Sequence, residues 1–196
     1  MRRPGSWCPA AKLQQATEFA VQAVRSVKVG DPNGDVYMGP VVSERRWTRI
    51  QELIRQGIAE GATLAAGGEG RPKDLERGYY VRPTIFTNVR NDMTIAREEI
   101  FGPVLCILSY RDVEDAISIA NDTIYGLSAY VQSATDARAE EVAARLETGL
   151  AFINGADEDF EAPFGGYKMS GNGREWGEIA FGDFLETKAV IHRKAA

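Results

Sequence analysis

The chain has 196 residues and an ordinary globular composition, with 44% hydrophobic and 26% charged residues. A formal net charge of −5 argues against a general nucleic-acid-binding protein, which would carry a basic face. No apolar run approaches the roughly 18 residues that a membrane-spanning helix needs, and the first residues lack the apolar stretch of a secretory signal. We therefore expect a cytoplasmic protein with no nucleic-acid and no membrane partner.

The chain contains two cysteines, Cys8 and Cys106, and one histidine, His192. Two cysteines fit a reducing compartment and cannot form a disulfide framework. Zinc sites of the Cys/His type normally need three or four such ligands, so we expect no metal site. A Ser-His-Asp triad would depend on His192, which stands beside a basic tail, whereas a triad base needs a buried orienting carboxylate.

The first part of the chain alternates helical and extended patterns. Apolar residues recur at helical spacing before a Gly/Pro/Asn breaker cluster, and a second helical pattern follows Ser43, a favourable N-cap. We expect helices at 10–28 and from Ser43 to Gly61, a short strand at 63–66, and a surface loop at 67–78.

The rest of the chain repeats this alternation. Segments rich in aromatic and β-branched residues indicate strands, and Asp112 is a favourable N-cap. We expect strands at 79–86, 104–110, 128–132, 150–154 and 185–192, and helices after Asp112 and at 136–147. Strands that alternate with helices of this length imply βαβ units, so we predict one α/β domain with a mainly parallel sheet flanked by helices.

Two segments do not resemble scaffold. Residues 98–103, Glu-Glu-Ile-Phe-Gly-Pro, place two carboxylates and an aromatic ring in a turn before a strand. Such a turn can hold a carboxylate towards ribose hydroxyls, as in dinucleotide-binding folds. The alternative is a helix end with solvated glutamates and with Phe101 as a core residue.

The second segment, residues 154–177, combines many glycines with aromatic and charged residues, which indicates close backbone approaches and a functional loop. Gly171-Asn172-Gly173 is a poor phosphate-binding motif, because Trp176 stands where a third glycine is required and no strand leads directly into it.

Together these segments resemble the aldehyde dehydrogenase family. Residues 98–103 are similar to its coenzyme-contact motif, and residues 163–175, Pro-Phe-Gly-Gly-Tyr-Lys-Met-Ser-Gly-Asn-Gly-Arg-Glu, are similar to its C-terminal active-site motif. Shorter matches occur in the family's order, and the resemblance runs from about Pro9 to His192. It implies a catalytic-domain-like fold over 9–184, truncated at its start, and a C-terminal oligomerisation strand and tail over 185–196.

The resemblance implies a role for each matching residue. Glu99 would bind the nicotinamide ribose of NAD or NADP, and Phe101 would pack near the nicotinamide. Phe164 would line the aldehyde tunnel, and so would Phe160, although the loop before Pro163 is about one residue shorter than in common relatives. Glu175 would help to relay a proton without touching the reacting carbon. For Lys168, a loop-shaping role and a solvated surface position remain open.

The family's nucleophilic cysteine lies in a Gly-Gln-x-Cys turn, which the resemblance places at or just before Met1. The general base and the nucleotide-binding fold lie further upstream, so we expect this chain to be inactive alone. Cys8 lacks the Gly-Gln context, and mid-strand Cys106 is expected to be a buried, inert thiol.

The leading hypothesis is NAD(P)-dependent oxidation of an aldehyde to a carboxylic acid. The alternatives are a non-catalytic module that docks onto a full-length homologue, and one half of a split enzyme. An exposed sheet edge also favours self-association as a homo-oligomer.

Overall fold

The computed structural model describes residues 5–193. The chain divides into two compact units, the first ending at Thr123 and the second beginning at Ile124. This division falls inside the single domain expected over 9–184. Each unit has its own strands and helices and is described separately.

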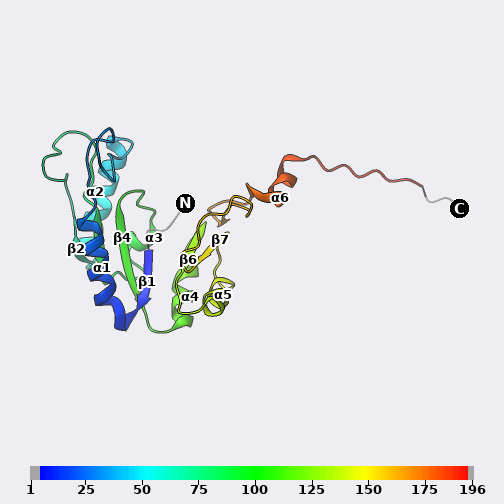
Figure 1. Ribbon diagram of the computed structural model, residues 1–196, viewed down its shortest axis with the longest axis horizontal. Helices are drawn as coiled ribbons and strands as arrows, with labels where there is room; N and C mark the ends of the chain where they lie inside the picture. Colours follow the sequence, from blue (N-terminus) through cyan, green and yellow to red (C-terminus); the bar gives the residue numbers. More distant parts are fainter. Residues whose placement is uncertain (1–4, 194–196) are drawn as a thin grey trace. The chain divides into compact units, whose positions relative to one another are not determined.

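The first unit is built on a four-stranded sheet of order β1-β4-β3-β2 (Figure 1). Strand β1 (Gly5–Pro9) and β3 (Thr84–Thr87) both run parallel to the central β4 (Val104–Tyr110), whereas β2 (Thr63–Ala66) pairs antiparallel with β3. The prediction of a mainly parallel sheet flanked by helices is confirmed.

Helices cover both faces of this sheet. A 3-10 turn, η1 (Ala10–Lys12), leads into α1 (Leu13–Arg25), whose Thr17 hydroxyl lies 3.0 Å from that of Thr87. Phe86, next to Thr87 in β3, points to the opposite face, where α2 (Glu44–Ala59) and α3 (Thr94–Arg97) pack.

Side-chain caps begin two of the helices at the expected places. The Ser43 hydroxyl accepts a hydrogen bond from the Arg46 N–H at 3.3 Å, at the start of α2. The Asp112 carboxylate accepts one from the Asp115 N–H at 2.9 Å, at the start of α4 (Val113–Asn121). Each cap satisfies a backbone donor that the helix leaves unpaired.

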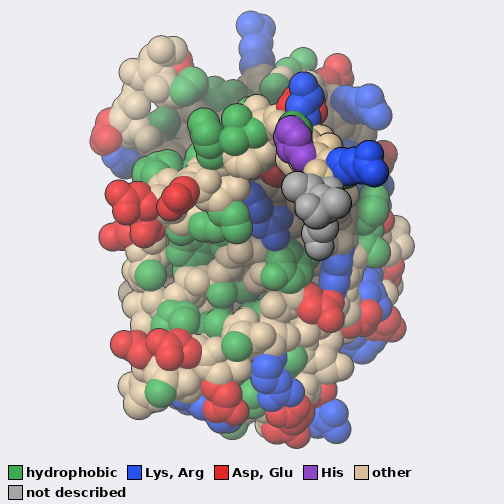
Figure 2. Space-filling model, turned by 90° about the vertical axis from the view of Figure 1, so that its right-hand side faces the viewer, with side chains coloured by type: hydrophobic (Ala, Val, Ile, Leu, Met, Phe, Trp, Pro, Cys, Tyr) green, Lys and Arg blue, Asp and Glu red, His purple; other side chains and the backbone are tan. Residues whose placement is uncertain are grey.

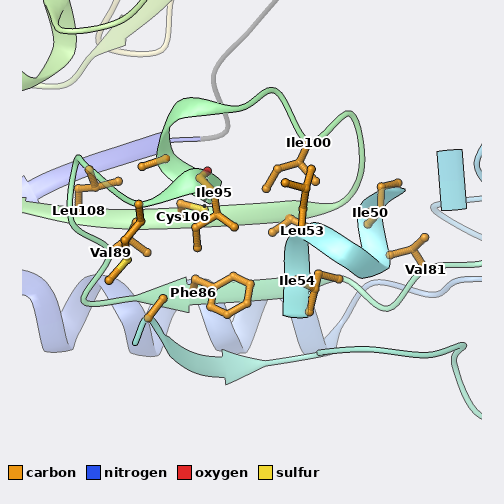
Figure 3. Close-up of a cluster of buried hydrophobic side chains, with 14 residues drawn as sticks. Ile50, Leu53, Ile54, Val81, Phe86, Val89, Ile95, Ile100, Cys106 and Leu108 are labelled. Carbon is orange, nitrogen blue, oxygen red and sulfur yellow. Dashed lines mark hydrogen bonds between the residues drawn. The ribbon is translucent and has the colours of Figure 1, made fainter. Parts of the chain in front are cut away.

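The core of this unit lies between the sheet and α2 (Figure 3). Ile50, Leu53 and Ile54 follow the three- and four-residue spacing of one helix face. They pack with residues of β3, β4 and the turn before β4, and the buried cluster comprises Ile50, Leu53, Ile54, Ala62, Val81, Phe86, Val89, Met93, Ile95, Ala96, Ile100, Val104, Cys106 and Leu108.

The second unit contains shorter elements. Strands β6 (Ser128–Val131) and β7 (Leu150–Ile153) are parallel and joined through α5 (Asp136–Ala143), which makes a βαβ unit. Strands β5 (Tyr125–Gly126) and β8 (Tyr167–Lys168) form an antiparallel pair. A short helix, α6 (Gly177–Ala180), and a 3-10 turn, η2 (Phe181–Phe184), follow.

Several of the expected elements differ from the structure, and the first helix, for example, ends at Arg25 and not at residue 28. Residues 79–83 are not part of β3, because Pro83 has no N–H and the carbonyls of Tyr79 and Tyr80 accept from Val41 N–H and the Trp47 indole. Helix α5 ends at Ala143, before the expected 147. Residues 185–193 form no strand within the described chain, and the last residues of the expected tail, 194–196, lie outside it.

One face of the molecule shows side chains of both charges. On the face in Figure 2, acidic and basic side chains are interspersed among hydrophobic ones. No helix in the part of the chain that the structure describes is long and apolar enough to cross a membrane.

A carboxylate joins α2 to α3. Glu60, directly after α2, accepts hydrogen bonds from the Thr94 N–H at 2.7 Å and from the Thr94 hydroxyl at 2.6 Å. Burial raises the pKa of Glu60, but hydrogen bonds from Gln56 and Thr94 outweigh it and leave the pKa below its usual value of 4.5. A lowered folded-state pKa means that the stabilisation is fully present above the unfolded pKa and is lost as the pH falls through the folded value.

We predict that Glu60→Gln, which mimics the protonated acid, lowers the free energy of unfolding at neutral pH by about 1 kcal/mol. The difference from wild type should shrink as the pH falls below 4.5, where the wild-type carboxylate itself becomes protonated. Urea denaturation at a series of pH values measures this. Glu158→Gln, in an exposed loop of the second unit, is the matched control, and a Glu60→Gln deficit that persists unchanged into acid contradicts the assignment.

Candidate active-site segments

The first candidate segment is the turn between α3 and β4. Ile100 is fully buried, whereas the next residue, Phe101, has a φ of 56° and 61% of its surface exposed. A left-handed backbone is uncommon for a bulky residue, because its Cβ crowds the neighbouring carbonyl. The turn therefore anchors one side chain in the core and directs the adjacent ring outwards. The interpretation of Phe101 as a core residue is wrong.

Gly102 allows this turn to lie against α2. A Cβ at this position would lie 2.6 Å from Cδ1 of Ile50, which is itself fully buried. The following residues return the chain to the sheet, where the Thr84 N–H donates to the Pro103 carbonyl at 2.8 Å. The requirement at Gly102 is for close packing and not for a left-handed backbone.

Two arginines of α2 surround the turn. The Arg46 guanidinium lies 4.9 Å from the centre of the Phe101 ring, within the range of a cation–π contact. Arg49 lies 3.8 Å from the Glu98 carboxylate. Glu99, between these residues in the turn, is half-buried. The two glutamates thus differ, since Glu98 is exposed and paired with α2 whereas Glu99 is partly enclosed.

The second candidate segment begins where β7 ends. Asn154 has a φ of 49°, and both ends of its side chain are fixed. Its amide oxygen accepts from the Ser133 N–H at 2.8 Å, and its amide nitrogen donates to Asp136 at 2.8 Å. Asn154 therefore connects the ends of β6 and β7 to the first turn of α5 and fixes the start of the loop.

The loop closes on itself through a two-residue bridge. Phe164 and Glu175 exchange two backbone hydrogen bonds of 2.7 Å each, in antiparallel pairing. The ring of Trp176 then lies 4.8 Å from Phe164 and 4.8 Å from Phe160. Such tilted pairs are favourable arrangements of aromatic rings. Three aromatic side chains from separate parts of the loop form one cluster, which we call the ring cluster.

Backbone geometry holds Trp176 in this cluster. Trp176 has a φ of 63° and Gly177 a φ of 64°. A Cβ at Gly177 would lie 2.4 Å from the carbonyl oxygen of Glu161, so no side chain fits there. The two loop ends can approach each other only because residue 177 is glycine.

Arg174 and Lys168 have structural partners. The Arg174 guanidinium donates to the carbonyls of Gly166 and Gly173 at 3.0 and 2.8 Å, and its backbone N–H donates to Asp183 at 3.0 Å. Lys168 forms an ion pair with Glu147. These contacts join Arg174 to three parts of the loop, whereas Lys168 is an exposed residue with an ion-pair partner, so both interpretations of Lys168 stay open.

The two cysteines lie in the sheet of the first unit. Cys106 is fully buried in β4, and its thiol lies 3.5 Å from the Ile95 carbonyl oxygen. Cys8 lies in β1, and burial raises the pKa of its thiol. A raised pKa keeps a thiol protonated and poorly nucleophilic at neutral pH. Among the residues described, no group of three or more His, Cys, Asp or Glu side chains could hold a metal ion.

The expected site residues thus fall into two groups. Glu99 and Phe101 share one turn of the first unit, and Phe160, Phe164 and Glu175 share one loop of the second. Sequence reasoning missed Trp176 as the centre of the ring cluster and Arg46 as the partner of Phe101. The Trp-Gly pair beside a Gly-rich run was the only available signal for the first, and helix periodicity gives none for the second.

Solved structures that match this architecture include aldehyde dehydrogenases. A mutant aldehyde dehydrogenase C from Pseudomonas syringae, complexed with NAD+ and octanal, matches with a TM-score of 0.93 and 45% identity over 95% of this chain and 39% of that chain. An aldehyde dehydrogenase of Mycobacterium tuberculosis complexed with NAD+ matches with a TM-score of 0.89 and 41% identity, over 92% and 38% of the two chains.

Curated relatives give the same result. The chain is 54% identical over 184 residues to a 3-succinoylsemialdehyde-pyridine dehydrogenase of a Pseudomonas species, covering 93% of this chain and 39% of the relative. It is 49% identical over 165 residues to a putative aldehyde dehydrogenase of Staphylococcus aureus, covering 84% and 35%. The family model for the aldehyde dehydrogenase family matches residues 10–190, so this chain belongs to that family. It spans well under half the length of these relatives.

We predict that Gly102→Ala lowers the free energy of unfolding by about 1–3 kcal/mol, because the new methyl group overlaps Cδ1 of Ile50. Ile50→Val removes that atom and alone costs about 0.5–1.5 kcal/mol. The double variant should be more stable than the sum of the two losses implies, and a double-mutant cycle from urea denaturation measures the difference. Strictly additive losses contradict the contact.

Proposed function

We propose that this chain contributes the nicotinamide-binding turn and the substrate-tunnel loop of an NAD(P)-dependent aldehyde dehydrogenase, which oxidises an aldehyde to a carboxylic acid. The observation that carries the proposal is the strained backbone at both motif segments, since Phe101 within the first motif and Trp176 directly after the second both have left-handed φ values. Strain of this kind persists only where the surrounding structure enforces it, and it concentrates at functional sites.

The turn at Glu99 and Phe101 suits the nicotinamide end of the cofactor. A half-buried carboxylate can accept hydrogen bonds from two adjacent ribose hydroxyls. An aromatic ring two residues later offers a flat surface beside them, and its exposure leaves that surface accessible. When bound, NAD or NADP supplies the hydride acceptor. The contribution of this turn is to position the nicotinamide ribose and to exclude water around it.

The ring cluster suits the aldehyde. Phe160 is 67% exposed and offers apolar surface to a substrate, whereas Phe164 is held by its bridge to Glu175. That bridge also fixes the backbone of Glu175, the carboxylate that we assign to proton relay. An apolar, aromatic wall favours an aldehyde with an aliphatic or aromatic body, in line with the octanal and the 3-succinoylsemialdehyde-pyridine named for two relatives.

The cysteine that attacks the aldehyde is assigned to polypeptide outside this chain. Cys8 has a raised thiol pKa and Cys106 is buried, so neither suits nucleophilic catalysis. This chain alone is therefore expected to be inactive and to gain activity with the nucleotide-binding part of the enzyme. That assignment also covers a split enzyme, in which the two parts are separate polypeptides.

We predict that the purified chain, given aldehyde and NAD+, produces no NADH, because it supplies no activated cysteine. Co-expression with the N-terminal part of a related aldehyde dehydrogenase should restore NADH production, measured by absorbance.

In that complex, Glu99→Gln should raise the KM for NAD+ about tenfold, since a hydrogen bond from a ligand hydroxyl to a charged group is stronger than one to a neutral amide.

The matched control is Glu98→Gln, because Glu98 lies in the same turn but pairs with Arg49. It should leave the KM for NAD+ within about twofold of wild type. NADH production by the chain alone, abolished by Cys8→Ser, contradicts the assignment of the nucleophile. Equal effects of the two glutamate variants contradict the role of Glu99.

A specific observation supports association as a second activity. Residues 185–193 are exposed and form no strand within the described chain, although they include Leu185, Val190 and Ile191. Apolar residues in an exposed segment outside any sheet favour pairing with another sheet edge. We therefore assign this segment to pairing with a second subunit, either another copy or a full-length homologue.

Ile191, 92% exposed, is the residue to test. We predict that Ile191→Asp shifts the chain towards the monomer in size-exclusion chromatography with light scattering, because a buried interface disfavours a new charge. Val42→Asp is the matched control, since Val42 is 90% exposed but lies in the first unit. An unchanged mass distribution for Ile191→Asp contradicts the assignment.

A further inference from the structure

The sequence contains three Asn-Gly pairs, at Asn33, Asn154 and Asn172. Such pairs are prone to deamidation, because a following glycine leaves its backbone nitrogen unhindered. All three asparagines are exposed, so exposure does not distinguish them. The hydrogen bonds of each pair decide how easily the glycine nitrogen can reach the asparagine side chain.

Asn33 is held within a tight turn. Its backbone N–H and its amide nitrogen both donate to Asp31 Oδ1, at 2.9 Å each. The nitrogen that would attack, that of Gly34, donates to the Asp31 carbonyl at 2.9 Å. Both reacting groups are therefore engaged, and their bonds to the turn must break before they can meet.

Asn154 is held by its side chain. Its amide oxygen accepts from the Ser133 N–H and its amide nitrogen donates to Asp136, at 2.8 Å each. Cγ must swing towards the Gly155 nitrogen for reaction, which requires both of these hydrogen bonds to break. The same contacts that fix the start of the loop thus protect this residue.

Asn172 lacks such restraints. Within the described chain, neither its side chain nor the Gly173 N–H takes part in a hydrogen bond. The side chain borders a hollow that is also lined by Glu147, Lys168 and Arg174. We propose that Asn172 is the preferred site of spontaneous deamidation in this protein, and that its conversion adds a negative charge beside Lys168 and Arg174.

The reaction needs only water. The Gly173 nitrogen loses its proton to solvent and bonds to Cγ of Asn172, the bond from Cγ to the amide nitrogen breaks, and ammonia leaves. Water then opens the cyclic imide at either carbonyl, giving aspartate or isoaspartate. The isoaspartyl product lengthens the backbone just before residues 174 and 175, which pair with the rest of the loop.

The added charge has a defined effect. Arg174 now donates to the carbonyls of Gly166 and Gly173, which carry only partial negative charge. A carboxylate at residue 172 would compete for the same guanidinium, because charge-assisted hydrogen bonds are stronger than neutral ones. Deamidation therefore alters the loop that carries Glu175 and the ring cluster.

The test is to incubate the purified chain at physiological temperature and mildly alkaline pH and to follow all three asparagines by peptide mass spectrometry. We expect Asn172 to react about tenfold faster than Asn33 or Asn154, because the other two must first break two hydrogen bonds. In concentrated urea the chain is unfolded and each asparagine is still followed by glycine. The three deamidation rates should therefore become similar.

Gly173→Ala is the matched variant. A Cβ there meets only Asp183 Oδ2, at an ordinary 3.4 Å, so the fold should be retained, as circular dichroism can verify. The methyl group hinders the attacking nitrogen and should slow the reaction at Asn172 about tenfold while leaving the other two rates unchanged. Equal or faster reaction at Asn33 or Asn154, or a preference for Asn172 that survives in urea, overturns the proposal.

Discussion

The packing of α2 against the turn before β4 is the contact on which the first candidate segment depends. Ile50 fills the space that a side chain at Gly102 would otherwise occupy, while Ile100 is fully buried in the same cluster. Protein interiors are close-packed, so a shift of one methyl group in this contact is transmitted to its neighbours. The exposed ring of Phe101, and the carboxylate two residues before it, therefore take their positions from a hydrophobic contact between neighbouring residues.

The second unit also contains a strained aromatic residue that is followed by a closely packed glycine. Trp176 and Gly177 both have left-handed backbones, and the close approach of Gly177 to the Glu161 carbonyl closes the loop. In each unit, an aromatic residue with unfavourable backbone geometry is followed by a glycine that makes a close contact. The cost of the strained residue, about 1–3 kcal/mol, is offset by burial in one unit and by ring contacts in the other.

The sequence predicted the elements better than the contacts. Periodicity and capping located α2 and α4 because Ser43 and Asp112 act locally, through hydrogen bonds three residues away. The strand expected over 79–86 was too long because its first residues satisfy their carbonyls with Val41 and Trp47, partners distant in sequence. The same limit applies to the candidate site: family motifs proposed Glu99 and Phe164, whereas the positions of Arg46 and Trp176 follow from tertiary contacts.

The glycines of the segment 154–177 do not share one role. Gly165 and Gly177 each approach a backbone oxygen so closely that an added Cβ would lie 2.4 Å from it, and a larger residue would force the loop apart. Gly173 has no such neighbour, since its Cβ would meet a side-chain oxygen at 3.4 Å. Steric need thus explains Gly165 and Gly177 but not Gly173. At Gly173, the absence of a side chain instead determines how fast Asn172 deamidates. The same segment therefore contains residues that make the loop rigid and a residue whose slow modification alters it.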